Sequence, residues 1–215
     1  MRRRSLSLIV IIIIGIGVVA GLTLFSNHFD PGSRYSSQRL DYMGVIYRNQ
    51  SDIYAFNEGY SETDDCPWGF VHNGIDYFFN NDSEVLAATP GQISSINWRE
   101  FDNESNPLNR YNVFIRIRFN ATIELSYGFE PFTFVDGDQN RQIAMISVKV
   151  GDWVDKGDVI ARFFHVGVGA HIHFAVTMEN AFLNPEPFFG GADRTELLSL
   201  IHSYHPGWNI SYPAS

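Results

Sequence analysis

Short apolar runs broken by turn-forming residues limit the folds that this sequence can adopt. After about residue 41, six such runs are rich in Val, Ile, Phe and Tyr and are separated by Gly, Pro, Asn and Asp. Runs of this length and composition are typical of β-strands joined by tight turns. They lie at residues 84–88, 92–98, 112–119, 122–127, 159–164 and 170–177. The pattern predicts a mainly β protein.

Alternation is clearest at residues 113–119, where Ile115 and Ile117 alternate with Arg116 and Arg118. Because successive side chains of a strand point to opposite faces, the isoleucines share one face and the arginines share the other. A strand with one buried face and one polar face is typical of an antiparallel sheet. We therefore expect twisted antiparallel sheets.

The first 25 residues predict a membrane anchor. Residues 2–4 are all Arg, and residues 5–25 carry no charge. A helix of this length, at about 1.5 Å per residue, spans roughly the 30 Å of a bilayer's hydrocarbon core. The arginines favour a cytoplasmic N-terminus, which makes this a single-pass protein of the cell membrane with an extracytoplasmic domain. The alternative is a cleaved signal peptide with residues 18–20 as its cleavage site, but the long apolar run favours the uncleaved anchor.

The rest of the chain divides into three further segments. Residues 26–40 are mostly polar and predict a linker, and residues 41–192 form the main β domain. Residues 193–215 predict a short C-terminal helix and a tail, with Asp193 as the N-cap. The apolar residues at helical spacing are Leu197, Leu200, Ile201 and Tyr204.

The charge and composition exclude two classes of protein. The net charge is -9, and all 24 acidic residues follow position 25, whereas three of the 15 basic residues precede it. Such an acidic domain is repelled by phosphate backbones, so we expect no nucleic-acid partner. A content of 45% hydrophobic and 15% aromatic residues excludes a disordered acidic tail.

Two segments that contain histidine predict a metal site. The first holds His72 and Asp76, and the second holds His171 and His173 inside a predicted strand. The period of two puts both strand histidines on one face, while Ile172 between them points into the core. A catalytic zinc ion takes three ligands from His nitrogen and Asp oxygen and keeps a fourth position open. His72, Asp76 and one of the two strand histidines would supply this set.

Five motifs occur in a fixed order between residues 68 and 188. They are His72-x-Gly74-x-Asp76, Val85-x-Ala87-x-x-x-Gly91, a Gly-Asp hairpin at 148–160, His171-x-His173 and Asn184-Pro185. This ordered set resembles the lysostaphin and LytM-type zinc endopeptidases, which cut peptide bridges in bacterial cell walls. The resemblance implies the duplicated hybrid motif fold, in which barrel-sandwich-like sheets form a groove with zinc on its floor. It also implies that His72, Asp76 and His173 are the zinc ligands and that His171 is a catalytic histidine that does not bind the metal.

One part of the family pattern is missing. The family has a second catalytic histidine in a Tyr-x-His-Leu segment, and the counterpart at residues 126–131 puts Phe129 at that position. A phenylalanine side chain cannot donate a hydrogen bond. Two side chains are candidates for its replacement: Glu130, next in the sequence, as a general base, and His165, from the loop that leads to the His171 strand.

The leading interpretation is a membrane-anchored zinc metalloendopeptidase that hydrolyses peptide cross-links of a cell-wall or envelope polymer. The alternative, favoured by Phe129, is a catalytically impaired relative that binds zinc and acts as a binding or regulatory module. Retention of His171 favours the enzyme, because a structural zinc site would not need it. A biotinyl or lipoyl carrier domain shares the Gly-Asp hairpin, but Lys149 and Lys156 lie within the hairpin and not at a modifiable turn.

Overall fold

The computed structural model describes residues 39–101 and 109–213. The predicted membrane anchor at 1–25 and nearly all of the predicted linker lie outside these residues. No helix in the described part of the chain is long and apolar enough to cross a membrane.

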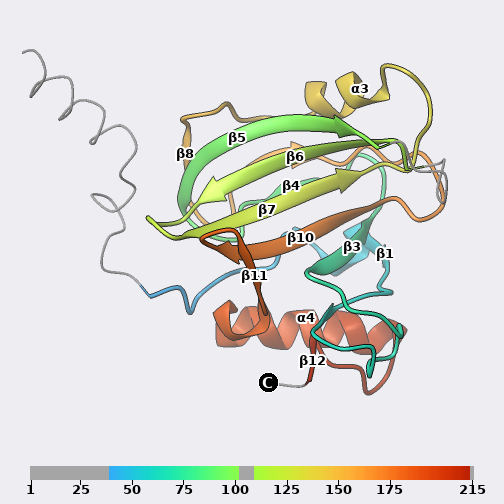
Figure 1. Cartoon of the computed structure of the whole chain (residues 1–215), viewed down its shortest axis with the longest axis vertical. Helices are drawn as coiled ribbons and strands as arrows, with labels where there is room; N and C mark the ends of the chain where they lie inside the picture. Colours follow the sequence, from blue (N-terminus) through green and yellow to red (C-terminus); the bar gives the residue numbers. More distant parts are fainter. Residues whose placement is uncertain (1–38, 102–108, 214–215) are drawn as a thin grey trace, which may run out of the picture.

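The described chain forms a mainly β structure with few helices (Figure 1). The strands are β1 (Ile53–Ala55), β2 (Tyr60–Ser61), β3 (Ile75–Phe79), β4 (Glu84–Leu86), β5 (Gly91–Glu100), β6 (Tyr111–Arg118), β7 (Ile123–Glu130), β8 (Trp153–Val154), β9 (Val159–Arg162), β10 (His171–Met178), β11 (Ala181–Leu183) and β12 (Ser211–Tyr212). The helices are α3 (Asp138–Ala144) and α4 (Gly191–Tyr204), with 3-10 turns η1 (Gln50–Asp52) and η2 (Glu186–Phe188).

One large sheet dominates the fold. Its strand order is β1-β3-β10-β7-β6-β5-β8, with β11 beside β10, and all of its pairs are antiparallel. The sheet curls into a half-barrel, as Figure 1 shows. Two small sheets accompany it: antiparallel β4–β9 and parallel β12–β2. The prediction of a mainly β protein built on twisted antiparallel sheet is confirmed.

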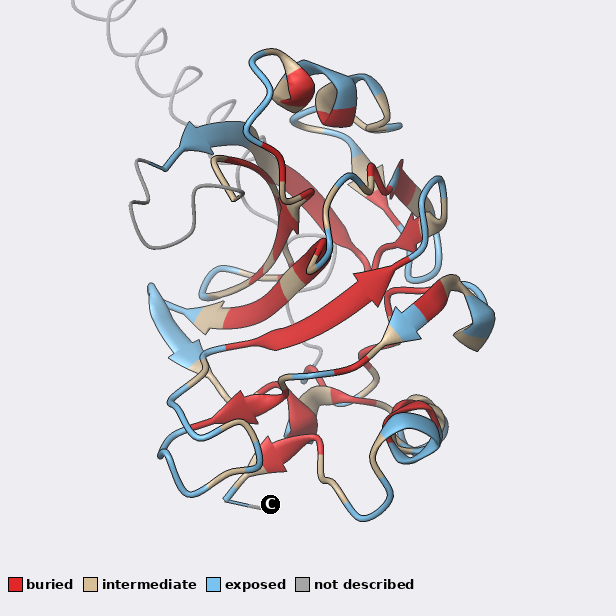
Figure 2. Cartoon of the chain, turned by 90° about the vertical axis from the view of Figure 1, so that its right-hand side faces the viewer, coloured by how far each residue is buried: buried red, intermediate tan, exposed pale blue. Residues whose placement is uncertain are grey.

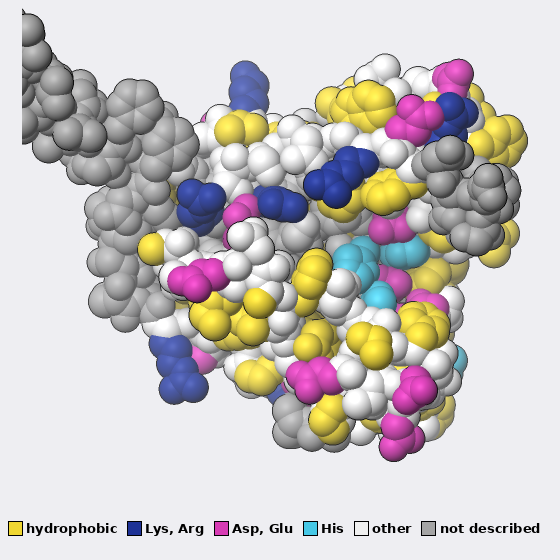
Figure 3. All heavy atoms as spheres, viewed as in Figure 1, with side chains coloured by type: hydrophobic (Ala, Val, Ile, Leu, Met, Phe, Trp, Pro, Cys, Tyr) yellow, Lys and Arg dark blue, Asp and Glu magenta, His cyan; other side chains and the backbone are white. Residues whose placement is uncertain are grey.

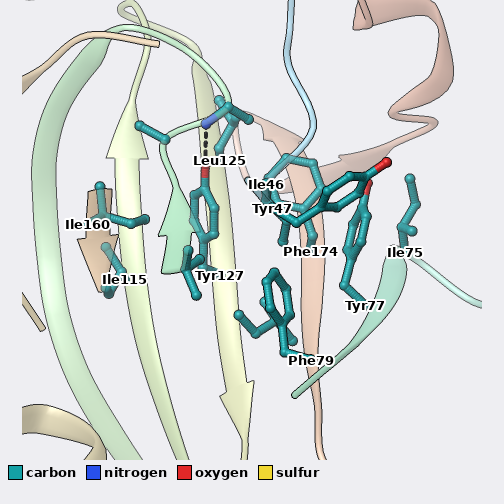
Figure 4. Close-up of a cluster of buried hydrophobic side chains, with 14 of the residues drawn as sticks. Ile46, Tyr47, Ile75, Tyr77, Phe79, Ile115, Leu125, Tyr127, Ile160 and Phe174 are labelled. Carbon is teal, nitrogen blue, oxygen red and sulfur yellow. Dashed lines mark hydrogen bonds between the residues drawn. The ribbon is translucent and has the colours of Figure 1, made fainter. Parts of the chain in front are cut away.

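The core lies between the large sheet and the β4–β9 pair. Side chains from both sheets, including Ile115 of β6 and Ile160 of β9, are fully buried in one cluster. Figure 4 shows them beside Tyr127, whose hydroxyl accepts a hydrogen bond of 2.7 Å from the backbone N–H of Ala88. Figure 2 shows how burial concentrates on the central strands of the sheet. The alternation predicted for β6 is confirmed, because Ile115 and Ile117 face this core.

Several element boundaries differ from the sequence-based expectation. Strand β3 was not anticipated, because all five of its residues are buried and its sequence therefore does not alternate. Helix α3 was not anticipated from the sequence. Helix α4 begins at Gly191, two residues before the predicted cap Asp193. The carboxylate of Asp193 instead lies 2.7 Å from the Lys156 ammonium, which draws it away from a capping role.

Candidate active site

Three neighbouring strands bring the predicted site residues together. His173 of β10 pairs with Asp76 of β3 on one side and with Gly128 of β7 on the other. His171, two residues earlier on β10, pairs with Glu130 of β7. Directly opposite residues of a sheet project to the same face, so these side chains share one face. Figure 3 shows the histidines gathered on the surface.

Three atoms converge as ligands of one ion would. The Asp76 Oδ1 atom lies 2.9 Å from His173 Nδ1 and 3.4 Å from His72 Nε2. The two histidine nitrogens are 3.2 Å apart. Tetrahedral zinc with bonds of about 2.0–2.1 Å separates its ligand atoms by roughly 3.3 Å. The separations between these ligand atoms therefore suit a zinc ion. Among the described residues, His72, Asp76 and His173 are the group of three side chains that could hold a metal ion.

The backbone fixes which nitrogen of His72 faces the triad. The His72 Nδ1 atom lies 2.7 Å from the carbonyl oxygen of Gly59, so Nδ1–H donates to that oxygen. This leaves Nε2 without a proton and directed at Asp76. A histidine that binds metal commonly donates its other N–H to a backbone carbonyl in this way, which orients the ring and fixes its tautomer.

Glycine at position 74 makes room for the second histidine. A Cβ atom on Gly74 would lie 2.6 Å from Cε1 and 2.7 Å from Nε2 of His173. Any larger residue would push the imidazole away from Asp76. The close approach of the His173 ring thus explains why a glycine stands in the His72-x-Gly74-x-Asp76 motif.

The electrostatics of the site favour an ionised carboxylate surrounded by imidazole rings. Burial by itself raises the pKa of Asp76, but the surrounding histidines outweigh burial and hold that pKa far below its ordinary value. Burial lowers the pKa of His171, but the carboxylates of Asp76 and Glu130 outweigh it and raise the pKa above its usual range. In the protein without metal, His171 is therefore readily protonated.

His171 is held beside the triad without joining it. Its Nδ1–H donates to the Gly169 carbonyl oxygen at 2.7 Å. Its Nε2 lies 3.5 Å from Asp76 Oδ2 and 3.7 Å from Glu130 Oε2. These separations are too long for direct hydrogen bonds. The Nε2 atom is thus free to meet a substrate or a water molecule.

Phe129, which the family pattern puts at the position of the second catalytic histidine, does not face the site. Phe129 pairs with Ile172, is fully buried and packs against Phe163 in the core. Since side chains of a strand alternate, the site-facing positions of β7 are its neighbours Gly128 and Glu130. The Glu130 Oε2 atom also accepts a hydrogen bond of 2.6 Å from Asn109, whose contribution no sequence motif signalled.

His165 lies away from this cluster. Its Nδ1 atom is 3.0 Å from the Phe79 carbonyl oxygen, and its ring packs against Tyr54 and Phe163. Its backbone N–H donates to Asn81. These contacts hold His165 near the end of β3, so the geometry favours Glu130 over His165 as the extra polar group.

The site opens into a groove of about 880 Å³ on the outer face of the large sheet. His173 and Glu130 lie at one end of it, and Glu179 and Asn180 of the β10–β11 turn lie at the other. A groove is therefore present, but among the described sheets only the large one lines it, without the smaller second sheet that was expected to help form it. Arg116 and Arg118 of β6 were expected on the polar face of their strand. The sequence did not indicate that this face lines the same groove as the metal site.

A comparison of sequences identifies the family. Residues 70–185, more than half of the chain, match the sequence profile of Peptidase family M23. The chain belongs to peptidase family M23. The predicted resemblance to lysostaphin and LytM-type enzymes is thereby confirmed. No curated protein sequence matches the chain.

The solved structures to which the chain is similar include several peptidases. A zinc-containing peptidase from Vibrio cholerae is 21% identical, with 67% of this M23 chain and 39% of that chain covered and a TM-score of 0.42. Csd3 from Helicobacter pylori is 19% identical, with 75% and 41% covered and a TM-score of 0.45. The lysostaphin catalytic domain from Staphylococcus simulans is 22% identical, with 63% and 91% covered and a TM-score of 0.40. The chain spans about two fifths of the length of the first two.

Proposed function

We propose that this protein is a zinc metalloendopeptidase that hydrolyses peptide cross-links of a cell-wall or envelope polymer. In this proposal His72, Asp76 and His173 hold the zinc ion. The observation that carries it is the convergence of their three ligand atoms within 3.4 Å of one another, at the end of an open groove. His171 and Glu130 project to the same face and act on the reacting groups.

The chemistry divides between the metal and the protein side chains. When bound, zinc supplies a Lewis acid that lowers the pKa of a water molecule and polarises the scissile carbonyl. Glu130 accepts hydrogen bonds when ionised and is placed to take the proton of the attacking water. His171, in its protonated form, is placed to donate a hydrogen bond from Nε2 to the carbonyl oxygen as negative charge develops there. Glu130 then returns the proton to the leaving amine.

A second candidate function follows from the absence of a second histidine on β7. Gly128 and Glu130 occupy the site-facing positions of that strand, so the proton-transfer groups differ from the family pattern. A chain that bound zinc but lacked a competent base would act as a binding or regulatory module. The two functions differ in what Glu130 does.

Replacing Glu130 by Gln tests the proposal. The amide keeps the size of the side chain but cannot take a proton, so kcat should fall by about 100- to 1000-fold, in the range of a lost general base. The zinc content, read by atomic absorption, should stay unchanged. Glu84→Gln is a matched control, because Glu84 pairs with Arg48 and Arg162 away from the groove and its loss should leave kcat unchanged. Equal activity of wild type and Glu130→Gln would remove Glu130 from the mechanism, and a wild type without hydrolysis would favour the binding module.

We also propose that residues 5–25 anchor the domain on the extracytoplasmic side of the cell membrane. The uncharged run and the three preceding arginines support this. The full chain should then sediment with membranes and be digested by protease added outside intact cells. Recovery of a shortened chain from the medium would instead indicate a cleaved signal peptide.

A further inference from the structure

The groove gathers three arginines on an acidic molecule. The chain carries a net charge of -9, and the groove is lined by Arg99, Arg116 and Arg118 together with Glu124, Glu130 and Glu179. Figure 3 shows Lys and Arg side chains in a row across this face, above the histidines. Only an arginine that is not paired with one of these carboxylates offers a local positive charge to an anionic group.

The three arginines differ in how far their charge is already neutralised. Arg118 lies 3.8 Å from Glu124, which also accepts a hydrogen bond of 2.6 Å from Ser94. Arg99 lies over the ring of Phe114, with its guanidinium carbon 5.9 Å from the ring centre, and has no ion pair with a carboxylate of the described residues. Arg116 has no ion pair with any described residue.

Arg116 is the arginine whose binding capacity is most clearly unused. Its Nε atom is buried and has no hydrogen-bond partner among the described residues. A buried charged donor without a partner is costly, so the described residues leave the Arg116 guanidinium incompletely compensated. A guanidinium offers parallel donors that match the two oxygens of a carboxylate.

The sheet register places Arg116 at a defined distance from the metal site. His173 lies in one row with Gly128 and Phe114, and Arg116 is two residues beyond Phe114 on β6. Two strand spacings of about 4.8 Å and two residues of about 3.3 Å along the strand give roughly 12 Å between the Cα atoms.

Small side chains and one aromatic ring lie between His173 and Arg116. Gly128 lies beside His173, and the row of Arg116 continues through Ser126 to Ala175. Phe114 shares the row of His173 and Gly128, and a Cβ atom on Gly128 would lie 3.2 Å from its ring. The Phe114 ring and these small side chains therefore form the floor of the groove between the metal site and Arg116.

We propose that the groove selects peptides that carry a carboxylate about two to four residues from the hydrolysed bond, and that Arg116 pairs with that carboxylate. The spacing follows from the 12 Å separation, since an extended peptide rises about 3.3 Å per residue. The inference rests on the proposed peptidase function and adds a substrate class to it. Arg116 is a specificity residue and takes no part in the proton transfers.

The test uses the full chain with zinc and a set of ten-residue Gly/Ala peptides. Each peptide carries one Glu at a different position and has a partner with Gln there. Product masses give the distance from the Glu to the bond that is cut. A Glu two to four residues from that bond should raise kcat/KM by about 10- to 100-fold over Gln, the range expected for a hydrogen bond to a charged group.

Variants of Arg116 assign this preference to one side chain. Arg116→Gln should abolish the preference for Glu, read as the ratio of kcat/KM between matched Glu and Gln peptides, and Arg116→Lys should keep part of it. Arg162→Gln removes the same charge on another surface, where Arg162 pairs with Asp82 and Glu84, and should change nothing.

The outcomes separate this inference from the proposed function. Equal cleavage of Glu and Gln peptides would overturn the inference and leave the peptidase function standing. If no peptide were cut, the affinities of the wild-type protein for the same peptides would decide: tighter binding of Glu peptides that requires Arg116 supports the inference, and equal or absent binding overturns it.

Discussion

His173→Ala should lose zinc and, with it, all measurable peptide hydrolysis. The variant removes one of three converging ligand atoms and leaves Asp76 Oδ1 without its hydrogen bond of 2.9 Å. Loss of an outer-shell partner alone costs about 10- to 100-fold in metal affinity, so loss of a ligand should exceed this range. Isothermal titration calorimetry with zinc measures the loss of metal affinity.

A control variant separates metal binding from general effects of histidine loss. His202 is exposed, lies on α4 and contacts the Trp208 carbonyl oxygen, so His202→Ala should keep wild-type zinc affinity. Circular dichroism should show the same β-sheet content for both variants. Full zinc occupancy in folded His173→Ala would disprove the proposed ligand set.

His171→Ala should separate zinc binding from catalysis. Because His171 Nε2 faces the site but lies outside the ligand triad, the variant should keep its zinc while kcat falls by about 100- to 1000-fold, as on loss of a donor to the developing oxyanion. Parallel measurements of zinc content and peptide hydrolysis check both halves of this result.

Two outcomes would contradict the role given to His171. Hydrolysis at the wild-type rate would show that His171 takes no part in the reaction. Loss of zinc from His171→Ala would make His171 a ligand, and the separate roles of His171 and His173 would then be wrong. A substitution of His205, which stacks on Trp208 and contacts the Phe56 carbonyl, should affect neither property.

Local patterns in the sequence were enough to predict β6, one of the strands that line the groove, and its two faces. In β6 the alternation of Ile115 and Ile117 with Arg116 and Arg118 predicted both faces correctly, because one face packs on the core and the other lines the groove. Strand β3 could not be recognised in this way. It lies between β1 and β10 with both faces covered, so its residues are uniformly apolar apart from Asp76.

The metal site was partly readable from spacing. The placement of His171 and His173 on one face depends only on the period of a strand, and their approach to His72 and Asp76 followed from the family resemblance. The position on β7 was different. The family pattern puts Phe129 at the position of the second histidine, whereas the strand pairing turns Phe129 to the core and its neighbour Glu130 to the site.

The sequence by itself determined the periodicities: which segments are strands with one buried face, and which histidines lie two residues apart. The tertiary structure alone decided the pairing of strands that lie far apart in the chain. That pairing directs Glu130 toward His171, packs the His173 ring against Gly74 and aligns Arg116 with the metal site. The physical reason is that alternation is a local property of the backbone, whereas register is set by the joint packing of distant segments around a shared core.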